Sequence, residues 1–206
     1  GATRSVLGGI NGANLGVLDL TVDGAAKGSV NNSAFSGIAS LNSDVSASNV
    51  AVTAVRDPYI SDPPPAYSGV QRGRAVIFET DAGDWDFAIE DSFVDDYQKN
   101  GIQVLGAGST VNIVNNQVAC GGPQPTMGQN GIVVMNGAKG NVEGNQVGSC
   151  SLPSAPVASA LLLYNAGGPI TVTGNTIEDS DFGPSVADAD GERLALPPQS
   201  PSTSPD

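Results

Sequence analysis

Apolar and polar residues alternate along short stretches of this chain, and the stretches recur at a nearly constant interval. Two series mark the recurrence, one of apolar residues and one of asparagines: Ile102, Ile132 and Leu161, and Asn116, Asn145 and Asn175. Within each series, neighbouring members lie 29 or 30 residues apart. A fixed period of this length indicates a solenoid, in which each repeat must stack on its neighbours to bury its apolar face.

The runs within each repeat have the pattern of short strands. Period-two alternation places alternate side chains on one face, so Ile102 with Val104, and Val111 with Ile113, are expected to face the interior. Bends rich in Gly and Asn separate the runs, and no stretch has the composition of a long amphipathic helix. Short strands joined by such bends predict an all-β protein, a parallel β-helix of about six coils over residues 1–182.

Three segments interrupt the repeat. Residues 57–67 contain consecutive prolines, which cannot donate to a sheet, and are expected to form a loop. Residues 120–126 are expected to form a second, smaller loop. Residues 183–206 are rich in Pro, Ser and Asp and cannot bury a core, so we expect a tail or linker.

The asparagine series has an architectural interpretation. Asn tolerates the left-handed conformation of a sharp bend, and its amide can both donate to and accept from the adjacent coils. Asn116, Asn145 and Asn175 therefore predict an internal asparagine ladder. The alternative is a row of ligand-binding amides.

Two cysteines also recur at the repeat period, because Cys120 and Cys150 lie 30 residues apart. Adjacent coils stack at about 4.8 Å, close to the Cα separation of about 4.4–6.8 Å that a disulfide needs. The spacing favours a disulfide between coils, which would imply an oxidising compartment. The alternative is a pair of buried thiols.

Charge and composition exclude several classes of function. Eight basic and 21 acidic residues give a net charge of −13, which would repel nucleic acid. Histidine is absent, which removes Ser-His-Asp and Cys-His chemistry and His-dependent metal sites. We find neither an apolar run long enough to span a membrane nor the pattern of a signal peptide, so we expect a soluble chain, either mature or cut from a longer protein.

Three segments carry a family resemblance: residues 96–102, residues 129–132 and residues 140–147. They resemble the right-handed parallel β-helix repeat proteins of bacteria, which have the pectate-lyase-like architecture and are secreted or exposed on the cell surface. The resemblance covers roughly residues 14–179 and implies a right-handed, single-stranded β-helix. It does not specify an activity, since the superfamily includes lyases, hydrolases, epimerases and adhesins.

Members of that superfamily that cleave polysaccharides use carboxylate pairs, or calcium beside an Arg or Lys base. Lys99, Arg72 and Asp96 are the candidate catalytic residues, with Lys99 as the base. Asp91, Asp95 and Asp96 are the candidate calcium ligands, although no cofactor is required for the fold. The alternative is that the acids are solvated and that Arg72 and Lys99 pair with Asp95 and Asp96.

Aromatic side chains outside the inward pattern are candidates for carbohydrate binding, because a ring face is an apolar platform for a pyranose. The four candidates are Trp85, Tyr97, Tyr59 and Tyr67. Phe87 takes the inward place of Val111 and is assigned to the core.

Two functions follow. The favoured one is a secreted or cell-surface β-helix without catalytic activity, which binds carbohydrate or assembles through the open ends of the tube. Its partners would be a polysaccharide or surface glycan and further copies of the chain. The alternative is a calcium-assisted polysaccharide lyase or glycoside hydrolase acting on an acidic glycan.

Overall fold

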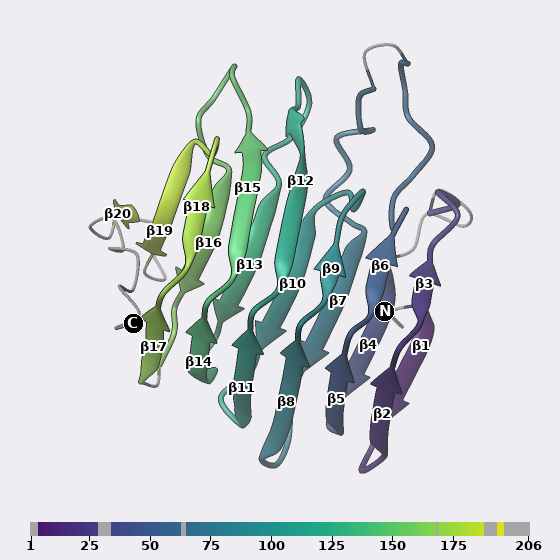
Figure 1. Ribbon diagram of the computed structural model, residues 1–206, viewed down its shortest axis with the longest axis vertical. Helices are drawn as coiled ribbons and strands as arrows, with labels where there is room; N and C mark the ends of the chain where they lie inside the picture. The colour runs from purple at the N-terminus through teal and green to yellow at the C-terminus, as the bar shows by residue number, and fades with distance from the viewer. Residues whose placement is uncertain (1–3, 29–33, 63–64, 168, 188–192, 196–206) are drawn as a thin grey trace, which may run out of the picture.

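The computed structural model describes residues 4–28, 34–62, 65–167, 169–187 and 193–195, which form three parallel sheets wound around one core (Figure 1). The chain visits sheets A, B and C in turn and then returns to sheet A one coil further on. Six such circuits confirm a parallel β-helix of about six coils. None of the described residues forms a helix long and apolar enough to cross a membrane.

Each sheet collects one strand from every coil. Sheet A contains β1 (Arg4–Ile10), β4 (Phe35–Leu41), β7 (Arg74–Glu79), β10 (Asn100–Leu105), β13 (Asn130–Met135), β16 (Ser159–Tyr164), β19 (Phe182–Ala187) and β20 (Arg193–Ala195). Sheet B contains β2 (Asn14–Leu18), β5 (Asp44–Ser48), β8 (Trp85–Glu90), β11 (Ser109–Val114), β14 (Lys139–Glu143) and β17 (Ile170–Thr173). Sheet C contains β3 (Thr21–Asp23), β6 (Ala51–Thr53), β9 (Phe93–Val94), β12 (Gln117–Pro123), β15 (Gln146–Ser151) and β18 (Thr176–Glu178).

The core consists of apolar ladders that run through successive coils. In sheet A, residues in register across five strands are all fully buried: Ile38, Val76, Ile102, Ile132 and Leu161. Phe87 points inward as predicted, and its ring stacks on Phe78 with centroids 4.7 Å apart. Each buried side chain of this size contributes about 1.5–3 kcal/mol, so the ladders supply most of the force that holds the coils together.

The corners between sheets depend on the left-handed backbone conformation. At the corner between sheets A and B and at the corner between sheets B and C, non-glycine residues adopt φ values between 48° and 55°: Asn11, Asn42, Asn136 and Asn165, and Asp19, Asn49, Asp91 and Asn115. Asn and Asp are the residues that tolerate this conformation best after Gly. The abundance of Asn in the sequence therefore reflects the geometry of the corners.

The asparagine ladder is present, with one correction. The side-chain amide of Asn116 donates to the carbonyl of Ile89 and to Asn145 Oδ1, the latter at 3.0 Å. The backbone N–H of Asn116 donates to the same Asn145 Oδ1 at 2.9 Å. Asn145 makes the same contacts with Asn175 at 2.9 Å. The left-handed residue, however, precedes each ladder asparagine, as at Asn115 with φ 55° and Gly144 with φ 65°. The ladder amides therefore serve hydrogen bonding, and the bend itself belongs to the preceding residue.

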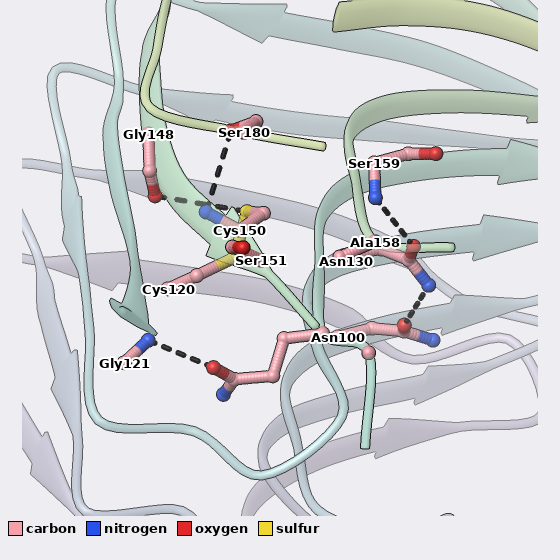
Figure 2. The surroundings of a disulfide bond; sticks show 12 residues. Asn100, Cys120, Gly121, Asn130, Gly148, Cys150, Ser151, Ala158, Ser159 and Ser180 are labelled. Carbon is pink, nitrogen blue, oxygen red and sulfur yellow. Dashed lines mark hydrogen bonds between the residues drawn. A yellow bond between two sulfur atoms is a disulfide. The ribbon is translucent and has the colours of Figure 1, made fainter. Parts of the chain in front are cut away.

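The predicted disulfide is also present. Cys120 and Cys150 are bonded, with their Cα atoms 5.0 Å apart, and link β12 to β15 in adjacent coils (Figure 2). Figure 2 also shows a second, shorter ladder that the repeat pattern did not predict. There Asn130 donates to Asn100 Oδ1 at 3.0 Å and accepts from the N–H of Ser159 at 3.1 Å.

The interruptions of the repeat agree with the structure in part. Residues 57–62 and 65–67 lie in the long connection between β6 and β7, as expected, and residues 63–64 lie outside the described residues. Residues 120–123 do not form a separate loop, because β12 continues to Pro123 through a register shift between Ala119 and Gly122. Residues 183–187, which we assigned to the tail, belong to β19, and β20 pairs with it antiparallel. Residues 188–192 and 196–206 of the predicted tail lie outside the described residues.

Replacing the central ladder amide tests the contribution of the ladder. Asn145→Ala removes the side-chain acceptor of the buried Asn116 backbone N–H, the side-chain donor to the carbonyl of Ile113, and one of the two donors to Asn175 Oδ1. We expect a loss of about 3 kcal/mol. The measurement is the urea midpoint by circular dichroism. Asn141→Ala, at an exposed position of β14, is the control. Equal midpoints for the two variants would contradict the structural role of the ladder.

Candidate functional site

The corner between sheets B and C carries a row of outward polar side chains. The left-handed residues of successive coils stack there, and those of the first four coils are exposed: Asp19, Asn49, Asp91 and Asn115. In the last two coils Gly144 and Gly174 take the same place, so the row ends at Asn115. Because coils repeat at about 4.8 Å, the row offers one polar group per coil.

A groove of about 690 Å³ follows this corner across β3, β6 and β9. Phe93 contributes its wall with 38% of its surface exposed, beside the polar side chains of Asp91, Asn115 and Gln117. Within the described part of the chain, no hydrogen bond or ion pair occupies those three polar side chains. Elsewhere in the groove the side chain of Asn49 donates to Asp19 Oδ1 at 2.8 Å. This hydrogen bond holds the first two polar side chains of the row against each other.

The groove is acidic. Asp19 and Asp91 line it, and its lining includes no Lys or Arg. An anionic ligand would therefore meet repulsion, whereas hydroxyl groups can donate to the carboxylates and to the amide oxygens. The combination of one exposed ring with free amides and carboxylates suits a neutral, hydroxyl-rich ligand.

A second groove of about 490 Å³ crosses the outer face of sheet B, and two of its polar side chains are engaged within the chain. Asp44 accepts from the N–H of Asp86 at 2.9 Å. Asn112 donates to Glu90 Oε1 at 2.7 Å. The floor of this second groove is made of small residues such as Ser46 and Ala88, without an exposed ring. We therefore favour the corner groove as the binding site.

The three predicted catalytic residues do not converge. Arg72 is buried and pairs with Asp57 at 2.8 Å, rather than with Asp95 or Asp96. Lys99 Nζ donates to the carbonyl of Gly128 at 2.6 Å. Asp96 pairs instead with Arg56 at 2.5 Å. Each of the three is held by a different partner, so this geometry supplies no free base beside a carboxylate.

The structure does not bring the three predicted calcium ligands together. Among the described residues, no three acidic side chains come close enough to hold a metal ion. Asp91 precedes β9 at the corner between sheets B and C, and Asp96 follows β9 near the opposite corner, so the short strand separates them. Asp96 is further neutralised by Arg56, and one oxygen of Asp95 is buried without a partner.

Two of the four aromatic candidates are buried. Tyr97 is fully buried, and its hydroxyl lies 2.8 Å from the sulfur of Cys120. Burial raises the pKa of Tyr97 well above its ordinary value, because its charged form would have no solvent. Tyr67 is 2% exposed and forms a hydrogen bond to Asp96. Neither ring can serve as a platform for a sugar, which corrects the expectation for both residues.

The other two aromatic candidates are half-buried and engaged. Arg56 lies 3.6 Å above the ring of Tyr59, whose hydroxyl donates to Asp96 at 2.9 Å. Trp85 donates its indole N–H to the carbonyl of Ala82 at 2.8 Å and packs against the core. Sequence reasoning missed Phe93, the exposed ring in the groove. The two-residue strand β9 gives too short a run for alternation to show that Phe93 points outward.

Two carboxylates anchor the proline-rich connection to the coils. Asp96 accepts from Arg56, Tyr59 and Tyr67. Asp57 accepts from Arg72 and Ser68 within the connection, and it reaches the next coil through Gln98, whose amide oxygen accepts from the Asp57 N–H at 2.7 Å. These contacts assign Asp96 and Arg72 to the support of the connection.

Comparisons with known proteins add no family. No family model matches the chain, and no curated protein or solved structure is significantly similar to it. The parallel β-helix is established by the structure, and the resemblance to the pectate-lyase-like superfamily stays a prediction.

Acid should weaken the anchored connection. Burial of Asp57 opposes its ionisation, but the hydrogen bonds and charge of Arg72, with Ser68 and Gln98, outweigh this and lower its pKa. The stabilisation is therefore present above about pH 4 and is lost as pH falls through the lowered pKa.

Asp57→Asn tests this linkage. We expect the variant to lose about 3 kcal/mol at pH 7, because it leaves the buried Arg72 without its ion pair. It should also lose less stability than the parent between pH 4 and pH 2. Urea midpoints across this range are the measurement, and Asp62→Asn controls for the loss of one charge from the same connection. A parallel pH profile for Asp57→Asn and the parent would contradict the linkage.

Proposed function

We propose that the chain is a β-helix without catalytic activity that binds a neutral glycan in the groove at the corner between sheets B and C. The observation that carries the proposal is the exposure of Phe93 beside the free side chains of Asp91, Asn115 and Gln117. A ring beside unpaired hydrogen-bonding groups is the arrangement that positions the apolar face and the hydroxyls of a sugar.

The repeat favours a polymer as the ligand. Equivalent side chains recur at about 4.8 Å along the corner, so a linear glycan lying along the tube would meet Asp19, Asn49, Asp91 and Asn115 in order. The acidic lining favours a neutral or amino-sugar polymer over a uronate polymer. The Cys120–Cys150 disulfide is consistent with a location outside the reducing cytosol.

Phe93→Ala is the direct test. Loss of the exposed ring should weaken binding about tenfold, equivalent to about 1.4 kcal/mol. Affinity electrophoresis against neutral, amino-sugar and uronate polysaccharides would identify the polymer, and isothermal titration would measure its affinity. Val157→Ala, which trims another exposed apolar side chain far from the groove, is the matched control.

The result that contradicts the proposal is unchanged affinity in Phe93→Ala, or stronger binding of uronate than of neutral polymers. A second variant, Gln117→Ala, separates the groove from a local effect at Phe93, because it removes a free amide from the same lining. We expect it to weaken binding about threefold to tenfold.

A further inference from the structure

The two ends of the tube differ. At the C-terminal end β20 pairs antiparallel with β19 and closes part of the edge of sheet A. At the N-terminal end β1, β2 and β3 each pair on one side, so three edges are open within the described part of the chain (Figure 1). Open edge strands present unpaired N–H and C=O groups that another strand can use.

The open end is also the most apolar part of the surface. Eight large apolar side chains are exposed among the described residues, and half of them belong to the first coil. They are Val6, Ile10, Leu18 and Leu20, with exposed fractions of 54%, 66%, 63% and 38%. Concentration of such residues around open edges marks an interaction surface.

Charge indicates what can approach this surface. Residues 4–28 carry Arg4, Lys27, Asp19 and Asp23 and are therefore neutral, whereas the whole chain has a net charge of −13. Two copies of the chain carry like net charge, and the neutral first coil adds nothing to their repulsion. The surface thus fits a second copy of the same chain.

The charges of the first coil lie at different corners. Arg4 and Lys27 line one pocket of about 200 Å³ near the corner between sheets C and A, together with Val6 and Phe35. Asp19 and Leu20 lie at the corner between sheets B and C. Asp23, at the end of β3, offsets one of the two positive charges at the first corner, which leaves that corner with a net positive charge and a pocket. The other corner is acidic and exposes Leu20, so the two corners are complementary.

We propose that two copies pair through their N-terminal ends about a twofold axis that bisects sheet C. Strands related by such an axis run antiparallel, so β3 meets its own copy and β1 meets β2 of the second copy. The axis exchanges the two corners at the ends of sheet C. Asp19 of one copy then faces Lys27 and Arg4 of the other, and Leu20 faces the pocket lined by Val6.

A twofold axis that bisects sheet A or sheet B would instead place like charges against each other. An axis that bisects sheet A brings Asp19 against its own copy, and one that bisects sheet B brings Lys27 against its own copy. Like charges at a contact of this kind oppose association. The interface is small, since β1, β2 and β3 contribute 7, 5 and 3 residues. We therefore expect a dissociation constant of about 1–100 µM.

Sedimentation equilibrium of the 206-residue chain tests the proposal. The parent should approach twice its monomer mass of 20.6 kDa as concentration rises. Lys27→Glu should raise the dissociation constant about tenfold, because each Asp19 then faces a like charge. Lys139→Glu on β14 makes the same charge change away from the open end and should alter the constant less than about twofold.

A second substitution, Asp19→Asn, should change the dissociation constant in opposite directions in two backgrounds, which a merely structural effect would not do. Asp19→Asn keeps a residue that tolerates the left-handed conformation. Alone it should weaken the dimer about threefold, whereas in the Lys27→Glu background it should strengthen the dimer, because it removes the repulsion. Circular dichroism checks that each variant remains folded.

A chain that stays monomeric up to about 1 mM overturns the proposal. So does a dimer that Lys139→Glu weakens as much as Lys27→Glu, since that would be a general effect of charge. A dimer in which Asp19→Asn has the same sign in both backgrounds also overturns it, because the two corners would then not face each other.

Discussion

The structure depends on one constraint, which is that each residue stacks on its equivalent in the next coil. Parallel pairing in constant register joins five buried aliphatic residues from Ile38 to Leu161 into a single ladder. The same register lets Asn116, Asn145 and Asn175 satisfy one another inside the tube. Since a repeat contacts only its neighbours, stability accumulates by such neighbour contacts.

The same stacking explains why a candidate binding site exists. The corner between sheets B and C needs a left-handed residue in every coil, and the residues that tolerate this conformation best after Gly, Asn and Asp, are polar. A structural demand therefore produces an outward row of carboxylates and amides at no cost to the core. Phe93 adds an apolar ring at the middle of that row.

The fold could be predicted from the sequence because the signals that specify it are periodic. The ladders, the disulfide and the asparagine series all recur at one interval, and stacking follows from the interval alone. The site could not be predicted in the same way. Arg72 pairs with Asp57 and Asp96 with Arg56, and these partners come from a proline-rich connection whose path no period describes. Phe93 was missed because its strand is too short to show alternation.

The Cys120–Cys150 bond makes the unfolding of the tube different from its two ends. Loss of structure in a solenoid spreads from one coil to the next, starting where an end coil frays. Coils beyond β15 are held by noncovalent contacts alone, whereas β12 and β15 are joined covalently. Fraying that begins at the C-terminal end therefore meets a covalent barrier before it reaches the coils that carry the groove. Under reducing conditions that barrier disappears, which makes the thiol state of the surroundings a determinant of how long the groove keeps its shape.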